Sequence, residues 1–273
     1  MKAKNLILSI LFFIPSIFFA CENYDEQERL QLIEGGETTD NTPITQKQEK
    51  VTLLLEDFTG WDCPNCPEGT EILNGIKDTY GEQVVVTAIH QGPFARPKDG
   101  ALDLRTPYGD ELGKGITSYP SLKINRSVIP STRGDWANAV NEYFETAQHL
   151  LNISLGAKIT AENFIVVSTE IDVLENINAD LLITLYVTES DIAGKQNDHG
   201  EHIEYLFQHV LRGNPIVDMP LVIGNAPQGN KINKSYMLKP AAGVNLDNSS
   251  VVVFVTDASN GKVLQANEIK LKR

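Results

Sequence analysis

The chain has 273 residues, of which 41% are hydrophobic, and a formal net charge of −13 at pH 7. This length and apolar content are enough for two ordinary hydrophobic cores. The acidic balance excludes a typical nucleic-acid-binding protein, because no basic stripe is available to contact phosphates. We therefore expect a two-domain protein that binds no nucleic acid and no cofactor.

The first twenty residues form an export leader. Lys2 and Lys4 give it a positively charged start, and residues 6–19 form an apolar core too short for a comfortable membrane span. Ala20 followed by Cys21 resembles a bacterial lipobox, in which the cysteine becomes the acylated first residue of the mature protein. Palmitate-type acyl chains on Cys21 then anchor the protein in a membrane. The alternative is an ordinary signal peptide with an incidental cysteine.

Residues 21–49 are rich in polar and acidic side chains and poor in large apolar ones. Such a segment buries too little surface to fold, so we predict a disordered acidic tether. Its opening, residues 22–26 (Glu-Asn-Tyr-Asp-Glu), resembles signals that send some lipoproteins to the outer face of the outer membrane. A solvated run of charge is the other interpretation.

Residues 50–150 alternate between strand-like and helix-like patterns. Buried strands are predicted over residues 51–55 and 84–89, and residues 68–80 between them carry apolar side chains at helical spacing. This order predicts a right-handed parallel crossover. The remaining predicted elements are a short irregular helix over 101–112, a turn entering a strand over 116–125, and a helix over 136–150.

From residue 151 the pattern changes to short strands separated by Asn, Asp and Gly turns. The predicted strands are residues 153–159, 164–173, 181–187, 235–238, 251–256 and 263–271. Residues 257–262 are a hairpin signal between the last two. This pattern predicts an all-β, immunoglobulin-like sandwich over residues 151–273.

Cys63 and Cys66 lie two residues apart at the predicted strand-to-helix turn. Helix N-terminal amides can stabilise a thiolate there, which makes the pair a candidate redox motif. Asp62 opposes a second negative charge beside it, and a helix that begins at Pro67 leaves Cys63 one turn outside. Three interpretations stay open: an active dithiol, a stable structural disulfide, and a metal site supplemented by His90.

The motifs around this pair resemble the thioredoxin fold, with Asp57 ending a buried strand and Tyr119-Pro120 preceding a later one. The resemblance implies an α/β domain in which Cys63 is the nucleophile and Cys66 the resolving thiol. It also implies a cis Pro120 facing the cysteines. Asp57 is then a proton acceptor for Cys66, or a strand-end carboxylate capped by backbone amides.

Glu56 competes with Asp57 for this role, because a one-residue shift in register exchanges the faces of the two side chains.

The whole chain also resembles the twenty-eight-kilodalton outer-membrane lipoprotein family of Gram-negative bacteria. Its members are similar in their lipidated leader, thioredoxin-like domain, Tyr-Pro-Ser loop and β-rich C-terminal half. Residues 205–212 (Tyr-Leu-Phe-Gln-His-Val-Leu-Arg) resemble a stretch associated with the same group. The resemblance implies a lipid-anchored protein of the cell outer membrane, exposed at the surface, with no settled activity.

Two functions follow. In the first, Cys63 and Cys66 exchange disulfides with the thiols of exported proteins. In the second, the sandwich domain is a surface binding or adhesion module and the cysteine pair is a structural disulfide.

Histidines and acids of residues 198–202 (Asp-His-Gly-Glu-His), with His209, offer metal ligands from a loop, although such groups near a turn are more often solvated. His209 and Arg212 lie on an apolar stretch, and we expect them to be paired inside the β-domain.

Overall fold

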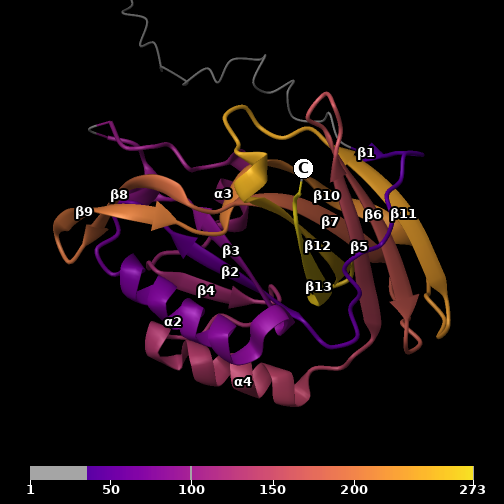
Figure 1. The fold of residues 1–273 in the computed structure, drawn as a ribbon. Helices are drawn as coiled ribbons and strands as arrows, with labels where there is room; N and C mark the ends of the chain where they lie inside the picture. Colours follow the sequence, from indigo (N-terminus) through magenta and orange to yellow (C-terminus); the bar gives the residue numbers. More distant parts are fainter. Residues whose placement is uncertain (1–35, 99, 273) are drawn as a thin grey trace, which may run out of the picture. The chain divides into compact units, whose positions relative to one another are not determined.

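The computed structural model describes residues 36–98 and 100–272 (Figure 1). The leader, the lipidation site at Cys21 and the first part of the predicted tether lie outside the described residues. Within the described part, no helix is both long enough and apolar enough to cross a membrane.

A seven-stranded mixed sheet forms the centre of the fold. Its strand order is β13-β12-β7-β10-β3-β2-β4, in which β2, β3 and β10 run parallel and the other pairs are antiparallel. The strands are β2 (Leu53–Thr59), β3 (Val84–His90), β4 (Ser121–Ile124), β7 (Leu181–Glu189), β10 (Val210–Val222), β12 (Ser249–Asp257) and β13 (Val263–Lys270). Strands from both predicted domains therefore share one sheet.

A four-stranded antiparallel sheet packs on the half of this sheet that holds β7, β12 and β13 (Figure 1). Its strands, in order, are β1 (Gly36–Glu37), β11 (Lys231–Leu238), β6 (Ile165–Val173) and β5 (Leu151–Ile159). The side chains between the two sheets form the largest core cluster, which alternation along each strand produces. The protein is thus mostly β, with few helices, and this half is a β-sandwich.

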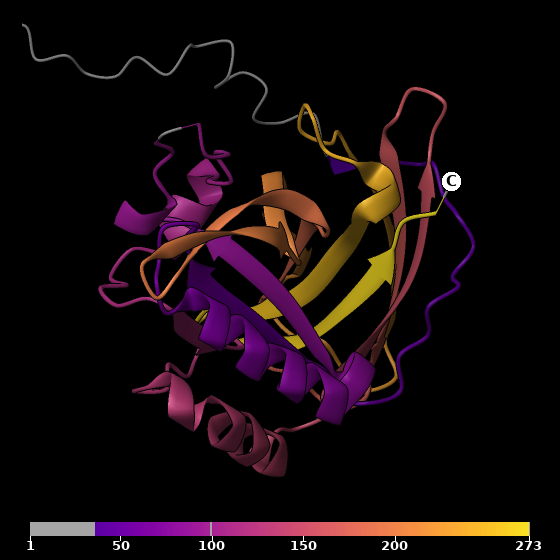
Figure 2. The ribbon, with the colours of Figure 1, turned by 60° about the vertical axis from the view of Figure 1, so that its left-hand side comes forward.

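Helices cover the other half of the seven-stranded sheet. Helices α2 (Cys66–Tyr80) and α4 (Trp136–Thr146) lie on one face, as Figure 2 shows, and bury Leu53 and Leu55 of β2 against Trp136. The opposite face packs against residues around α3 (Pro107–Leu112).

The seven-stranded sheet curls on itself. On its inner face, Leu54 and Phe58 of β2 pack in one cluster with Phe254 of β12. The backbone N–H of Val263, at the start of β13, donates to the carbonyl of Asn125, just after β4 (3.0 Å). The two ends of the sheet therefore approach each other.

A separate hairpin consists of β8 (Ile192–Asp198) and β9 (Glu201–Phe207), which pair with each other as a two-stranded sheet.

The prediction of a disordered tether over residues 21–49 is wrong from residue 36 onward. Gly36 pairs with Met237 of β11, and Gln46 forms a bridge with Leu155 of β5. Gln48 is buried and its side-chain amide donates to the carbonyl of Ala266 (2.5 Å). Hydrogen bonds of the backbone and of side-chain amides hold this segment in place. The prediction considered only apolar side chains, which are few here, and therefore missed the ordered structure.

The predicted elements also miss most of residues 192–222. Strand β8 is mostly polar and lacks the apolar alternation of a half-buried strand, whereas the alternation of Ile203, Tyr205 and Phe207 in β9 was overlooked. Strand β10 contains Gly213 and Pro215, and its pairing with β7 shifts register more than once. The predicted helix over 101–112 is reduced to α3, and the predicted helix over 136–150 ends at Thr146.

Candidate functional site

Cys63 and Cys66 are joined by a disulfide bond (S–S 2.09 Å) at the start of α2. Cys66 is the first helical residue, and its N–H donates to the carbonyl of Cys63 (3.3 Å) in the turn before the helix. Cys63 therefore lies outside the helix, where the stabilising effect of the helix dipole on a thiolate is weaker. Both residues are buried, with 1% and 2% of their surface exposed.

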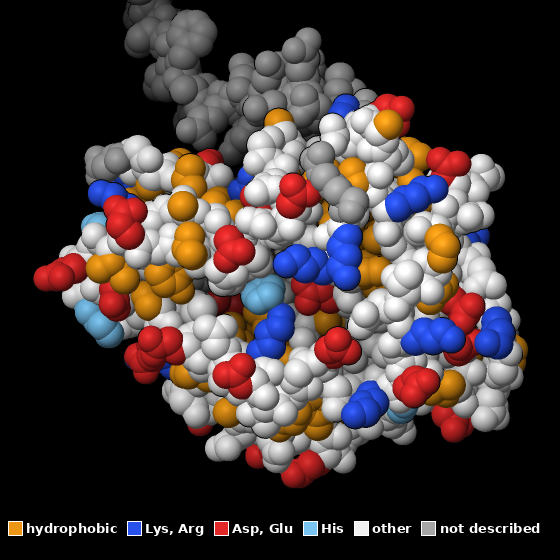
Figure 3. All heavy atoms as spheres, viewed as in Figure 1, with side chains coloured by type: hydrophobic (Ala, Val, Ile, Leu, Met, Phe, Trp, Pro, Cys, Tyr) orange, Lys and Arg blue, Asp and Glu red, His pale blue; other side chains and the backbone are white. Residues whose placement is uncertain are grey.

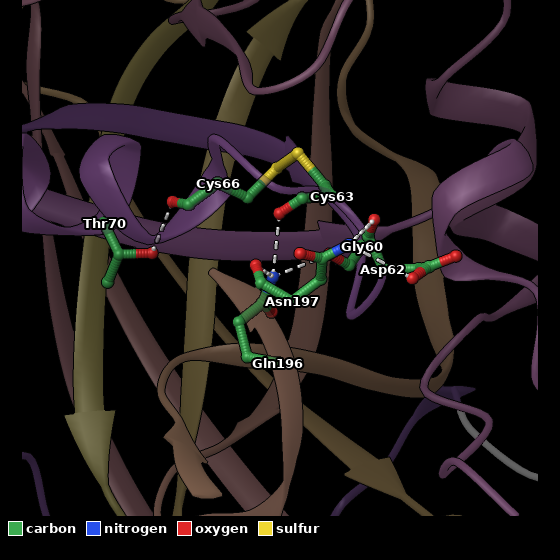
Figure 4. The surroundings of a disulfide bond; sticks show 7 residues. All are labelled: Gly60, Asp62, Cys63, Cys66, Thr70, Gln196 and Asn197. Atoms are coloured by element: carbon green, nitrogen blue, oxygen red, sulfur yellow. Dashed lines mark hydrogen bonds between the residues drawn. A yellow bond between two sulfur atoms is a disulfide. The ribbon is translucent and has the colours of Figure 1, made fainter. Parts of the chain in front are cut away.

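The tip of hairpin β8–β9 covers this disulfide loop (Figure 4). The side-chain amide of Gln196 donates to the carbonyls of Gly60 (3.3 Å) and Cys63 (3.0 Å). The backbone N–H of Asn197 donates to the carbonyl of Trp61 (2.7 Å).

The hairpin makes two further hydrogen bonds to the carbonyls of this loop. The side-chain amide of Asn197 donates to the carbonyl of Asp62 (3.2 Å), and the N–H of His199 donates to the carbonyl of Pro64 (3.0 Å). Each carbonyl from Gly60 to Pro64 thus accepts a hydrogen bond from the hairpin.

The carboxylate of Asp62 is compensated rather than free beside the sulfur atoms. It accepts hydrogen bonds from Lys98 and from His202 of β9 (Nε2 to Oδ1, 3.0 Å). Partial burial raises the pKa of Asp62, but hydrogen bonds from Lys98, His202 and Asn197, together with the charge of Lys98, outweigh it and hold that pKa below the usual value. The negative charge of Asp62, which we expected to oppose a thiolate at the cysteines, is therefore stabilised by Lys98 and His202.

Asp57 lies on the face of β2 that α2 covers, because it shares the strand alternation of Leu53 and Leu55. It is 2% exposed, and its Oδ1 atom has no hydrogen-bond partner within the described part of the chain. Burial raises the pKa of Asp57 to about 7. The interpretation as a carboxylate capped by backbone amides does not fit this unpartnered oxygen.

Glu56 points to the opposite face of the sheet. Its Oε1 atom accepts hydrogen bonds from Arg126 (3.1 Å) and from the hydroxyl of Tyr186 (2.8 Å). Burial first, and then the Glu56 carboxylate, raise the pKa of Tyr186 well above its usual value. The strand register therefore excludes Glu56 from the surroundings of the cysteines.

Pro120 lies beside the first turn of α2. The Tyr119–Pro120 peptide bond is cis, and a Cβ atom added to Gly69 would lie 2.8 Å from the Cγ atom of Pro120. Gly69 follows Cys66 by three residues, which is one helical turn. The structure thus brings Pro120 onto the helix that starts with Cys66, above the strand that holds Asp57.

The chain's relatives fit this architecture. The model of the family described as outer membrane protein Omp28 matches residues 113–273. The chain belongs to the Omp28 family of outer membrane proteins. Membership of this family places the protein in the outer membrane.

Solved structures show the same fold for this Omp28-family chain at low sequence identity. HBP35 of Porphyromonas gingivalis is 23% identical with a TM-score of 0.64, covering 82% of this chain and 76% of that one. A structural-genomics protein from Agrobacterium tumefaciens is 17% identical with a TM-score of 0.53, covering 81% and 95%. No curated protein sequence matches the chain.

The Omp28 match begins after the cysteines. Pro120 and hairpin β8–β9 lie inside the matched range, whereas Asp57, Cys63 and Cys66 precede it. The site is thus built from both parts of the chain.

The hairpin residues Gln196 and Asn197 were missed by the sequence analysis of this Omp28-family protein. Tyr205 of β9, which the sequence analysis names only within the stretch 205–212, lies near Thr70, whose hydroxyl donates to the carbonyl of Cys66 (3.3 Å). The distance in sequence between these residues and the cysteines hid them, since a hairpin touches a remote loop only in the folded chain.

No group of three His, Cys, Asp or Glu side chains in the described residues is arranged to hold a metal ion. Residues 198–202 are not an open loop: Asp198 ends β8, His199 and Gly200 form the hairpin turn, and β9 begins at Glu201. His90 is buried on β3, and burial lowers its pKa to about 3, so this imidazole stays neutral. His209 contacts Lys77 (3.4 Å), and Arg212 forms an ion pair with Glu189 (3.2 Å).

Proposed function

We propose that this Omp28-family chain is a lipid-anchored envelope protein in which residues 50–150 form a thioredoxin-like segment. In this proposal the Cys63–Cys66 pair exchanges disulfides with the thiols of exported proteins. The parallel β2-α2-β3 unit, the disulfide at the start of α2 and Pro120 at the beginning of β4 support it.

The observation that carries the proposal is the buried carboxyl of Asp57. A carboxyl buried without a full set of hydrogen bonds lowers stability, and a purely structural disulfide has no use for it. Because its pKa is about 7, this group is partly protonated at neutral pH and can both give and take a proton. It lies on the helix-covered face of the sheet, on the side of Cys66.

The exchange proceeds in two displacements. A thiolate of the exported protein attacks the Sγ atom of Cys63, the bond to Cys66 breaks, and Cys66 leaves as a thiolate that takes a proton from Asp57. A second thiolate of the partner then attacks the partner's sulfur in the mixed disulfide and releases Cys63. The partner gains a disulfide and this protein is left with two thiols; the reverse sequence reduces the partner.

The burial of both cysteines favours a second candidate function. Sulfur atoms that are covered on all sides resist attack by external thiols. In this case the disulfide is structural, and the protein acts as a surface binding or adhesion lipoprotein through its sandwich.

Trapping separates the two functions. In a Cys66→Ser variant a partner attacked by Cys63 stays covalently attached, and we expect reducible adducts with envelope proteins, absent from a Cys63→Ser/Cys66→Ser control. No adducts above the control, together with a reduction potential below about −300 mV for the wild-type pair, would establish the structural disulfide instead.

The lipid anchor is tested separately at Cys21, which lies outside the described residues. Replacing it by serine removes the acylation site, so we expect the Cys21→Ser variant to leave the membrane fraction while wild type stays in it. Mass spectrometry of the wild-type N-terminal peptide should show the acyl chains, and an unmodified Cys21 in the mature protein would refute the anchor.

A further inference from the structure

We infer that the tip of hairpin β8–β9 occupies the site where an extended segment of a partner protein docks, so that the hairpin is an internal competitor of the partner. This inference rests on the proposed disulfide exchange. It names the substrate as an extended, cysteine-bearing polypeptide segment that pairs with the loop of residues 60–64.

The loop offers a row of hydrogen-bond acceptors. All five carbonyls from Gly60 to Pro64 accept hydrogen bonds from the hairpin. Two of the donors are backbone N–H groups, that of Asn197 near the end of β8 and that of His199 in the turn that follows (φ 50°). An extended partner segment that presents backbone N–H groups on one side can donate to the same carbonyls.

The hairpin is a separate element that can move without breaking a large sheet. Within the described residues β8 and β9 pair only with each other, and two strands alone are marginally stable. Asp191 and His209 flank the hairpin, and both have left-handed backbone conformations (φ 58° and 55°). These two positions mark its hinge, where a few backbone rotations are enough to lift the tip.

The base of the hairpin is fixed more firmly than its tip. Phe207 is buried and packs edge-on against His90, with ring centroids 5.2 Å apart. The tip is attached to the disulfide loop chiefly by polar contacts, whose loss is offset by hydrogen bonds to water or to a partner.

Strand β9 carries exposed apolar side chains. Ile203 and Leu206 are exposed (39% and 54%), one on each face of the strand. Figure 3 shows hydrophobic side chains gathered on the left of the molecule, where Figure 1 places the hairpin. Displacing the tip therefore frees the row of carbonyls that runs through Cys63, next to apolar surface.

The first experiment measures how strongly the hairpin tip limits the reaction of Cys63 with an external reagent. Full-length mature protein with Cys66→Ser carries the reactive Cys63 thiol, which attacks Ellman's reagent to form a mixed disulfide and release thionitrobenzoate. Adding Gln196→Ala and Asn197→Ala removes the three side-chain hydrogen bonds to loop carbonyls, and we expect the rate to rise at least tenfold. The control Lys195→Ala, an exposed position of the same strand, should leave the rate unchanged.

A single Asn197→Ala substitution guards against misfolding of the double variant. It removes the side-chain contacts to the carbonyl and carboxylate of Asp62, and the acceptor for the N–H of Gly200, but keeps both Gln196 contacts and the backbone N–H of residue 197, so we expect a smaller increase of about threefold. Equal rates in all of these variants, with circular dichroism unchanged, would overturn the competitor role of the hairpin.

The second experiment measures docking. The probe is a ten-residue Val/Thr peptide whose central cysteine is activated with thionitrobenzoate, so that Cys63 displaces thionitrobenzoate and joins the peptide. One version has N-methyl groups on two residues of the same strand face, and another has them on the alternate face. We expect one methylated peptide to react at least fivefold more slowly than the parent, and the other to react like the parent.

The outcomes separate this inference from the proposed function. If the parent and both methylated peptides react equally, pairing with the carbonyl row is refuted, while disulfide exchange stands. If Ellman's reagent reacts with the loosened variant and no peptide does, exchange with polypeptides fails, and the inference fails with it.

Discussion

Glu56 and Asp57 are neighbouring carboxylates on β2 with opposite surroundings. Glu56 is held by Arg126 and Tyr186 inside the curl of the sheet, whereas the Oδ1 atom of Asp57, on the side of α2, has no hydrogen-bond partner among the described residues. The sequence places both at the end of a buried strand and predicts that one of them faces the cysteines. It cannot choose between them, because the choice depends on the register of β2 against its neighbours.

Replacing Asp57 by asparagine should change how stability depends on pH. The pKa of Asp57 is about 7 in the folded protein, against an ordinary value of 3.8, so between these pH values the folded protein holds the proton and the unfolded chain does not. Wild-type stability is therefore lost as pH rises toward 7, by about 4 kcal/mol at most. The Asp57→Asn variant has no carboxyl to ionise here and does not lose this stability. Urea unfolding from pH 4 to pH 8 should therefore show the free energy of unfolding of the variant rising relative to that of wild type.

The matched control is Asp78→Asn, at an exposed carboxyl of α2. Its stability should follow the wild-type pH profile. Parallel profiles for Asp57→Asn and wild type would show that Asp57 is ionised at neutral pH, and would remove the main support for disulfide exchange.

Helix α2 is the element that joins the cysteines to the rest of the site. Its apolar spacing predicts its existence and its end at Tyr80, and the structure extends its start by two residues to Cys66. The hairpin was not predicted, because β8 is mostly polar and, among the described residues, β8 and β9 pair only with each other, so their contact with the cysteine loop has no local signal. Half of the candidate site was thus visible in the sequence, and the half supplied by tertiary contacts was not.

Two glycines of α2 should respond oppositely to alanine. A Cβ atom at Gly69 would lie 2.8 Å from Pro120 and 3.2 Å from Trp136, so Gly69→Ala should lower the free energy of unfolding by about 1–3 kcal/mol. At Gly75 nothing lies within 4 Å, so Gly75→Ala should raise it by about 0.5–1 kcal/mol through helix propensity. Urea denaturation of both variants tests this, and a stabilised Gly69→Ala would show that Pro120 does not press on the helix.

At the scale of the whole molecule, the seven-stranded sheet runs through both segments that the sequence predicts as domains. Strand β10 pairs with β7 on one side and, through Val210 and Ala88, with β3 on the other. The change from mixed to all-β pattern at residue 151 marks a change of architecture. It contains no information on pairing between the two parts, since such contacts are long-range.

A substitution in the β-rich part should therefore loosen the strands near the cysteines. Phe254 of β12 is fully buried in the cluster that contains Leu54 and Phe58 of β2. We expect Phe254→Ala to lower stability by about 3–5 kcal/mol. Native-state hydrogen exchange should show equal losses of protection in β2, β3 and β12, whereas unchanged protection in β2 and β3 would mean that two domains unfold independently.

The route of β10 also bears on what can be cut from this chain. The segment that carries the family likeness starts at residue 113. An excised piece beginning there would lack β2, the hydrogen-bonded neighbour of β4, and β3, which pairs with β10 at Val210, so both strands would gain unpaired edges. Unpaired strand edges of this kind pair with strands of other molecules and cause aggregation. For this protein, the smallest soluble unit therefore has to be larger than its recognisable signature.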